Sequence, residues 1–214
     1  MAVKSEREYR DMTMEIRSAE TEDAEQEERK IVTGYASTFN EPYTLYEDED
    51  WKFDEVVDSR AFDKTDMSDV IMQYDHEGRV FARMSNNTLT VIPDEKGLLI
   101  QADLGGTELG RQLFEEIEGG YTNKMSFGFT VDSEERKDSK LEDGRLHTVR
   151  TITSVRKLYD VSAVSLPAND ATSISVRTLT DGEIERIRAE RLEAEALELR
   201  RRKLLAKAKL NGGQ

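Results

Sequence analysis

Short runs in which apolar and polar residues alternate follow one another along the middle of the chain. They are KIVTGYASTF, FDEVV, DVIMQY, NTLTVIPD, GLLIQADL, KMSFGFTV, HTVRTITSV and KLYDVSAVSL. A period of two over runs of this length is typical of β-strands, and their number predicts a barrel or a sandwich. Pro93 and Gly97 in PDEKG indicate a turn that joins two of the runs into a hairpin.

Two other segments have helical character. TELGRQLFEEIEGG places Leu109, Leu113 and Ile117 on one face, offers Thr107 as N-cap and ends at a glycine pair. DGEIERIRAERLEAEALELRRRKLLAKAK is rich in helix formers, with acidic residues early and basic residues late. Its possible coiled-coil seam is interrupted by Lys203 and consists of Ala189, Leu192, Ala196, Leu199, Ala206 and Leu210. A weak or partner-assisted coiled coil and a solvated single helix therefore both remain open.

Charge divides the chain into three parts. Residues 1–30 hold six Lys/Arg and ten Asp/Glu, whereas residues 181–214 hold nine and seven. We therefore predict a charged N-terminal segment at 1–30 with a possible first strand in MTMEIR, a β domain at 31–180 and a helical tail at 181–214. The charged stretch DSEERKDSKLEDGR, between later strands, is expected to be a mobile loop or hairpin tip.

Composition limits the chemistry that the chain can perform. Its 214 residues carry a formal net charge of -14 and include no cysteine. The acidic balance argues against a general affinity for nucleic acid. The longest apolar runs fall short of the ~20 residues that span a bilayer, and the N-terminus has no apolar signal region, so we expect a soluble protein of the cytosol. Thiolate nucleophiles and thiolate metal sites are excluded, and only His76 and His147 can supply an imidazole base.

The strand KMSFGFTV has two dissimilar faces. One face is apolar and consists of Met125, Phe127, Phe129 and Val131. The other face carries small or polar residues, Ser126, Gly128 and Thr130. The polar face is either an ordinary solvated side of a strand or a surface whose small residues leave room for a reactant to approach Ser126.

His76 and Asp160 are the other candidates for chemistry. His76 follows the apolar run DVIMQY, where a strand meets a loop, although many such histidines are packing or surface residues. A metal site from Asp75, His76 and Glu77 is disfavoured, because neighbouring strand residues point in opposite directions. Asp160 shares its predicted face with Leu158 and Ser162, so it needs a partner if that face is buried; an exposed strand end is the alternative.

These segments resemble a known family. YDHEGRVFARMSN, the glycine-ended helix followed by MSFGF, and LYDVSAVSLPAND look like the prohead maturation serine proteases of tailed bacteriophages, over about residues 14–177. That family is similar to the herpesvirus assemblins. The resemblance implies an α+β, mainly β fold, with an assemblin-like closed β-barrel ringed by a few helices and the charged helical tail appended.

The resemblance also implies roles for individual residues. Ser126 would be the nucleophile and His76 the base, with Asp160 favoured over His147 as third member of the triad. Gly128 would keep the strand face beside Ser126 open to a substrate backbone. The resemblance further places an oxyanion hole at the backbone N–H groups of Ala168 and Asn169, and it implies no cofactor and no metal.

The implied activity is cleavage of scaffold or major capsid protein extensions, and of the protease itself, inside the assembling procapsid in the host cytoplasm. The resemblance implies a homodimer or higher oligomer, with neither nucleic acid nor membrane as partner. A non-catalytic β-barrel assembly factor is the alternative from another class. A generic esterase is disfavoured because the chain has no G-x-S-x-G elbow.

Overall fold

The computed structural model describes residues 7–12, 17–19 and 29–165, and helical positions 185–187, 189–190, 192–193, 196–197 and 200–202. Contacts divide the chain into two compact units, Met1–Thr178 and Leu179–Gln214. The boundaries predicted at residues 30 and 180 stay predictions. In the second unit, Leu192 of the predicted seam is exposed, whereas Leu199 and Leu210 lie outside the described residues.

The first unit is mainly β. Its elements, in chain order, are β1 Glu8–Met12, β2 Arg17–Ala19, β3 Ile31–Thr38, β4 Tyr43–Glu47, β5 Trp51–Val57, β6 Ile71–Tyr74, β7 Glu77–Arg83, the 3-10 turn η1 Met84–Asn86, β8 Leu89–Pro93, β9 Gly97–Asp103, α1 Glu108–Glu118, β10 Lys124–Lys140 and β11 Leu146–Val164. The hairpin predicted around PDEKG is confirmed, because β8 and β9 pair in antiparallel fashion across it.

The strands form two sheets. One has the order β1-β10-β11-β5-β4, with β6 and β7 attached to β11, and the other has the order β2-β3-β9-β8. No strand pair joins the two sheets within the described part of the chain, so the expectation of a closed barrel is corrected. Closure requires a continuous ladder, but β11 exchanges its neighbour halfway, from β5 to β6. Among the described residues, the edge strands β1 and β4 each pair on one side only.

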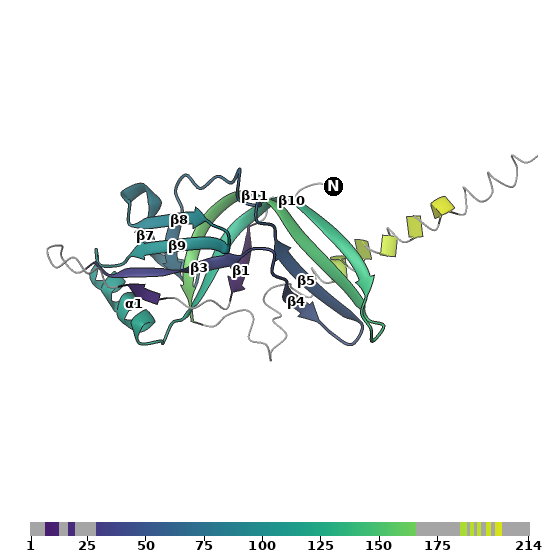
Figure 1. Cartoon of the computed structure of the whole chain (residues 1–214), viewed down its shortest axis with the longest axis horizontal. Coiled ribbons are helices and arrows are strands. Elements are labelled where there is room, and N and C mark those ends of the chain that lie inside the picture. Colours follow the sequence, from purple (N-terminus) through teal and green to yellow (C-terminus); the bar gives the residue numbers. More distant parts are fainter. Residues whose placement is uncertain are drawn as a thin grey trace, which may run out of the picture. The chain divides into compact units, whose positions relative to one another are not determined.

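The strands β10 and β11 are much longer than predicted (Figure 1). The stretch expected as a charged loop is strand as far as Lys140, and HTVRTITSV and KLYDVSAVSL form one continuous strand. Only residues 141–145 form the turn, where Gly144 has a φ of 89°. Of the two alternatives predicted for this stretch, the hairpin tip is confirmed and the mobile loop is wrong, because the antiparallel ladder satisfies the backbone of both segments whatever their side chains.

The helix α1 begins and ends where the sequence predicts. The hydroxyl of Thr107 accepts a hydrogen bond from the Gly110 N–H at 2.9 Å, and the helix ends at a glycine pair. Leu113 and Ile117 are buried as expected, whereas Leu109 is 37% exposed. The buried face passes through Gly110 instead, since a Cβ there would meet the Leu104 carbonyl oxygen at 2.2 Å.

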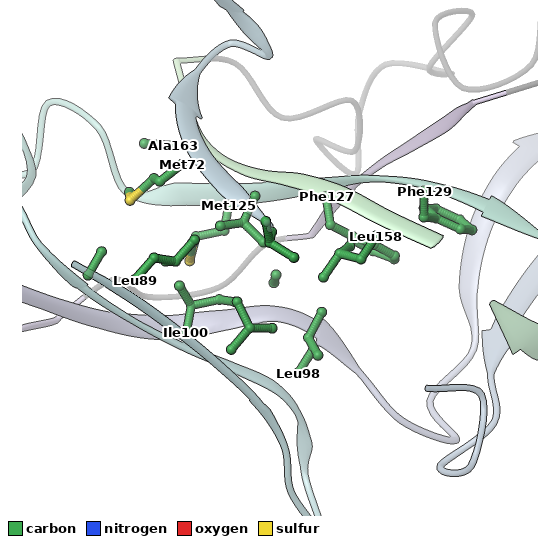
Figure 2. Close-up of a cluster of buried hydrophobic side chains, with 14 of the residues drawn as sticks. Met72, Leu89, Leu98, Ile100, Met125, Phe127, Phe129, Leu158 and Ala163 are labelled. Carbon is green, nitrogen blue, oxygen red and sulfur yellow. The ribbon is translucent and has the colours of Figure 1, made fainter. Parts of the chain in front are cut away.

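The core lies between the two sheets. Figure 2 shows Met125 and Phe127 of β10 over Leu98 and Ile100 of β9. Phe127 stacks on Phe129, with 4.6 Å between ring centroids. The apolar face predicted for β10 is therefore confirmed.

The opposite face of β10 is buried as well. Ser126 is fully buried and Thr130 is 4% exposed. The reading of this face as an ordinary solvated side is therefore wrong, and the elements that cover it define the candidate site.

Candidate active site

Three neighbouring strands bring Ser126, His76 and Asp160 together. Ser126 lies on β10 opposite Ser162 of β11, and Asp160 of β11 lies opposite Gly128. On its other side this end of β11 runs parallel to β6, whose last residue immediately precedes the turn that carries His76. The sheet order β10-β11-β6 therefore gathers residues that are 50 and 84 positions apart in the chain.

A tight turn between β6 and β7 presents His76. Asp75 and His76 are its two central residues, with φ values of 47° and 59°. Positive φ at both positions characterises the type I′ hairpin turn, and Asp is one of the residues that tolerates it. The Asp75 carboxylate accepts hydrogen bonds from the N–H and the hydroxyl of Ser165, at 3.0 and 2.9 Å, which anchors the turn to the end of β11.

The His76 ring makes one hydrogen bond with each of its nitrogens to the other two residues. Its Nδ1 lies 2.5 Å from Asp160 Oδ1, and its Nε2 lies 2.5 Å from Ser126 Oγ. When Nδ1 carries the proton and donates it to Asp160, Nε2 is free to accept the proton of Ser126. This geometry suits general-base activation of a serine hydroxyl.

Asp160 is fully buried and has three hydrogen-bonding partners. Besides His76, the Ser162 hydroxyl donates to its Oδ1 at 3.0 Å, and the guanidinium of Arg7 forms an ion pair with its Oδ2. The expectation that a buried Asp160 needs a partner is confirmed, and the exposed strand end is excluded. An unpaired carboxylate at this depth would be strongly destabilising.

A β-bulge decides which way Asp160 points. Gly128 pairs with Asp160, but the next residue, Phe129, pairs with Leu158, so Tyr159 is an extra residue in β11. Leu158 and Phe129 enter the core, whereas Asp160 faces His76. The predicted shared face of Leu158 and Asp160 is therefore wrong, because one inserted residue reverses the alternation.

Gly128 lies directly beneath the Asp160 carboxylate. A Cβ at Gly128 would meet Asp160 Oδ2 at 2.3 Å, Arg7 Nε at 2.9 Å and the Tyr9 ring at 2.9 Å. These groups fill the space beside Gly128 while Arg7 and Tyr9 are in place, and the expectation that Gly128 leaves room for a substrate backbone stays a prediction. Glycine at this position lets the carboxylate cross over β10 toward His76.

The strand β1 contributes residues that sequence reasoning missed. The carbonyl of Arg10 lies 2.9 Å from the Ser126 hydroxyl, as a hydrogen-bond acceptor. The Tyr9 ring packs edge-on against His76 with 4.4 Å between centroids, and Arg7 stacks on Tyr159. Residues 13–16 of the possible first strand MTMEIR lie outside the described residues, and β1 is EYRDM, Glu8–Met12. Its polar sequence carries no apolar alternation, so only the pairing with β10 identifies it.

Ionised side chains anchor β1 on its other face. The buried Arg10 donates to the fully buried Glu55 at 2.6 Å, and Arg150 also donates to Glu55 at 2.6 Å. Both arginines also form ion pairs with Glu8. Burial acts to raise the pKa of Glu55, but the charges of Arg10 and Arg150 outweigh burial and leave that pKa lowered. The carboxylates of this cluster therefore stay ionised at neutral pH.

The remaining predicted residues lie elsewhere. His147 Nε2 lies 2.7 Å from Asp54 Oδ2, and His147 pairs with Ser139, which is 13 residues beyond Ser126 along β10. The structure therefore does not bring His147 to Ser126. Ala168 and Asn169, predicted for the oxyanion hole, lie outside the described residues.

Neither a cluster of metal-ligating side chains nor a membrane-spanning helix is found among the described residues. Those residues contain no group of three or more His, Asp or Glu side chains that could hold a metal ion. Among the same residues, no helix is both long enough and apolar enough to cross a membrane.

A family of known proteins matches most of this chain. The model of a family described as caudovirus prohead serine protease matches residues 13–186, which is most of the chain. No curated protein and no solved structure match. The matched range contains Ser126, His76 and Asp160 but begins after β1.

Proposed function

This chain belongs to the caudovirus prohead serine protease family, and from that premise we propose that it hydrolyses peptide bonds with Ser126, His76 and Asp160. The observation that carries the proposal is the pair of 2.5 Å contacts that link Ser126 through His76 to Asp160. A serine, an imidazole and a carboxylate connected in this order form the catalytic triad of serine hydrolases on several unrelated folds.

The proposed reaction has two halves. In the first, Ser126 Oγ attacks the substrate carbonyl carbon while His76 Nε2 takes the hydroxyl proton, and His76 then gives that proton to the departing amine. In the second, His76 takes a proton from water, the resulting hydroxide attacks the acyl-serine ester, and the proton returns to Ser126. Asp160 holds the Nδ1–H tautomer throughout and stabilises the imidazolium.

Charge that develops on the substrate carbonyl oxygen also needs preorganised donors. We assign this task to the backbone N–H groups of Ala168 and Asn169, as the family resemblance suggests. Loss of a single such donor typically costs about 3–4 kcal/mol of transition-state stabilisation.

The substrates that we propose are extensions of the major capsid protein or of a scaffold protein, together with this chain itself. Prohead proteases act in the procapsid, which brings these proteins to the enzyme. Assembly as a homodimer or higher oligomer belongs to the same proposal.

Intact-mass spectrometry tests the nucleophile. We expect the wild-type chain, coexpressed with its capsid protein, to yield products cut at defined bonds, and the Ser126→Ala chain to leave both proteins whole. If wild type leaves both whole as well, the chain is a non-catalytic assembly factor. If both chains shorten identically, a host protease is responsible and the proposal fails.

A matched pair of variants tests the third member of the triad. His147→Ala removes an imidazole that contacts Asp54, so we expect processing to continue. Asp160→Asn keeps the shape of the side chain but not its charge, so processing should be lost. The reverse pattern would replace Asp160 by His147 in the mechanism.

A further inference from the structure

The proposed nucleophile is closed off from solvent. Ser126 and Asp160 are fully buried, and only 15% of the His76 side chain is exposed. A peptide substrate has to place a carbonyl carbon against Ser126 Oγ before any chemistry can begin. Part of the structure must therefore move, and β1 together with Arg7, the residue directly before it, is in contact with all three residues.

The strand β1 occupies the place of an extended peptide. It is the edge strand of its sheet, and it pairs with residues 125–129 of β10 in antiparallel fashion. Addition of a strand to a sheet edge is a recurring way to bind extended peptides. The backbone carbonyl oxygen of Arg10 lies 2.9 Å from Ser126 Oγ as a hydrogen-bond acceptor, and it competes with His76 Nε2 for the single hydroxyl proton.

Side chains of β1 bind on both faces of the sheet. Arg7, which directly precedes β1, and Tyr9 cover Asp160 and His76 on one face. On the other face Arg10 enters a buried site where Glu55 is its principal partner. Without β1, the fully buried Glu55 loses one of its two guanidinium partners and keeps Arg150, which Glu134 also binds, while Glu134 has Arg136 as a second partner. The site therefore favours a basic side chain from whichever strand occupies the edge.

We propose that β1 is an internal stand-in for the substrate, which closes the β10 edge until an extended peptide with a basic side chain facing Glu55 displaces it. The proposal rests on the proposed function, because it assigns the regulation and the substrate class of the same site. The strand β1 also lies outside the family match, which begins at residue 13, directly after the last residue of β1.

Covalent labelling of the full-length chain measures access to Ser126 without a known substrate. A fluorophosphonate forms a bond from its phosphorus to Ser126 Oγ and releases fluoride, and intact mass reports the rate. Two variants weaken β1 from opposite faces. Arg7→Ala removes the contact with Asp160, whereas Glu8→Ala removes contacts with Arg10 and Arg150 only. Arg60→Ala is the matched control, since this exposed arginine contacts only Asp58.

We expect both β1 variants to be labelled about tenfold faster than wild type, because each raises the population of the open edge. Arg60→Ala should keep the wild-type rate, and Ser126→Ala should stay unlabelled. Equal rates in wild type and both β1 variants would overturn the proposal while leaving the proposed function intact. Acceleration in Arg7→Ala alone would also overturn it, because Arg7 would then act on Asp160 directly. If Ser126 is never labelled in folded protein, the proposed function fails and this inference with it.

A peptide added in trans tests the site for the basic side chain. The capped peptide EREYRDMT, residues 6–13, should slow the labelling of Glu8→Ala by competing for the open edge. The same peptide with Glu in place of Arg10 should have no effect, because it would place a second carboxylate directly against the buried Glu55. Equal inhibition by the two peptides would overturn the assignment of a basic side chain.

Discussion

Glu55 is the residue whose removal should most clearly test how β1 is held. It lies on β5 with no exposed surface, and its carboxylate accepts from Arg10 Nε and from Arg150, each at 2.6 Å. The Tyr43 hydroxyl donates to the same carboxylate. The change Glu55→Ala removes all of these hydrogen bonds and leaves two buried guanidinium groups with fewer anions around them.

The expected loss of stability is large. Breaking a buried ion pair by removing one partner costs about 3–5 kcal/mol, because the remaining charge stays buried. At about 2–4 °C per kcal/mol for a domain of this size, the melting temperature should fall by roughly 6–20 °C. The matched control is Glu47→Ala on the neighbouring strand β4. Glu47 is bound to Arg145 with 42% of its side chain exposed, so its loss should cost only about 0–1 kcal/mol.

Urea denaturation followed by circular dichroism measures both variants in one buffer. We expect the Glu55→Ala midpoint to fall well below that of wild type, and the Glu47→Ala midpoint to stay close to it. If the two variants lose the same free energy of unfolding, the buried cluster does not hold β1 in the way inferred above. A Glu55→Ala protein as stable as wild type would refute the reasoning outright.

Three further predictions follow from single residues. Burial raises the pKa of Glu8, but its hydrogen bond from Arg150 and the charge of Arg10 bring that pKa down to about 2 from 4.5. Glu8 therefore contributes roughly 3 kcal/mol of stability above about pH 4.5, and this contribution is lost as the pH falls toward 2. In urea titrations, a Glu8→Gln chain should lose less stability than wild type over that pH range. Gly128→Ala would place a Cβ 2.3 Å from Asp160 Oδ2 and push the carboxylate back by about 1 Å. This displacement should lower kcat/KM for capsid-protein processing about 100-fold while the protein stays folded. An unchanged kcat/KM would contradict the placement of Asp160. The Thr130 hydroxyl is the only buried side-chain polar atom without a hydrogen-bond partner in the described residues. Thr130→Val should therefore leave the urea midpoint equal or higher. A loss of more than about 1 kcal/mol in the free energy of unfolding would show that the hydroxyl has a partner.

The sequence determined the features that depend on short stretches of chain. The helix α1 follows from its Thr107 cap and its glycine pair, and the hairpin of β8 and β9 follows from PDEKG, because capping and turn chemistry act within a few residues. The apolar face of β10 and the candidates Ser126, His76 and Asp160 were also identified from sequence. Their roles, however, came from a family resemblance and not from periodicity.

Only the tertiary structure decided how these pieces meet. The bulge at Tyr159 turns Asp160 away from Leu158, and an alternating pattern cannot show it, because one extra residue reverses the faces of everything beyond it. Likewise, EYRDM has no strand signature of its own. It is a strand because β10 offers an edge and because Glu55 and Arg150 bind its charged residues. Partners distant in sequence supply the free energy for such an element, so its place over Ser126 cannot be found in the segment itself.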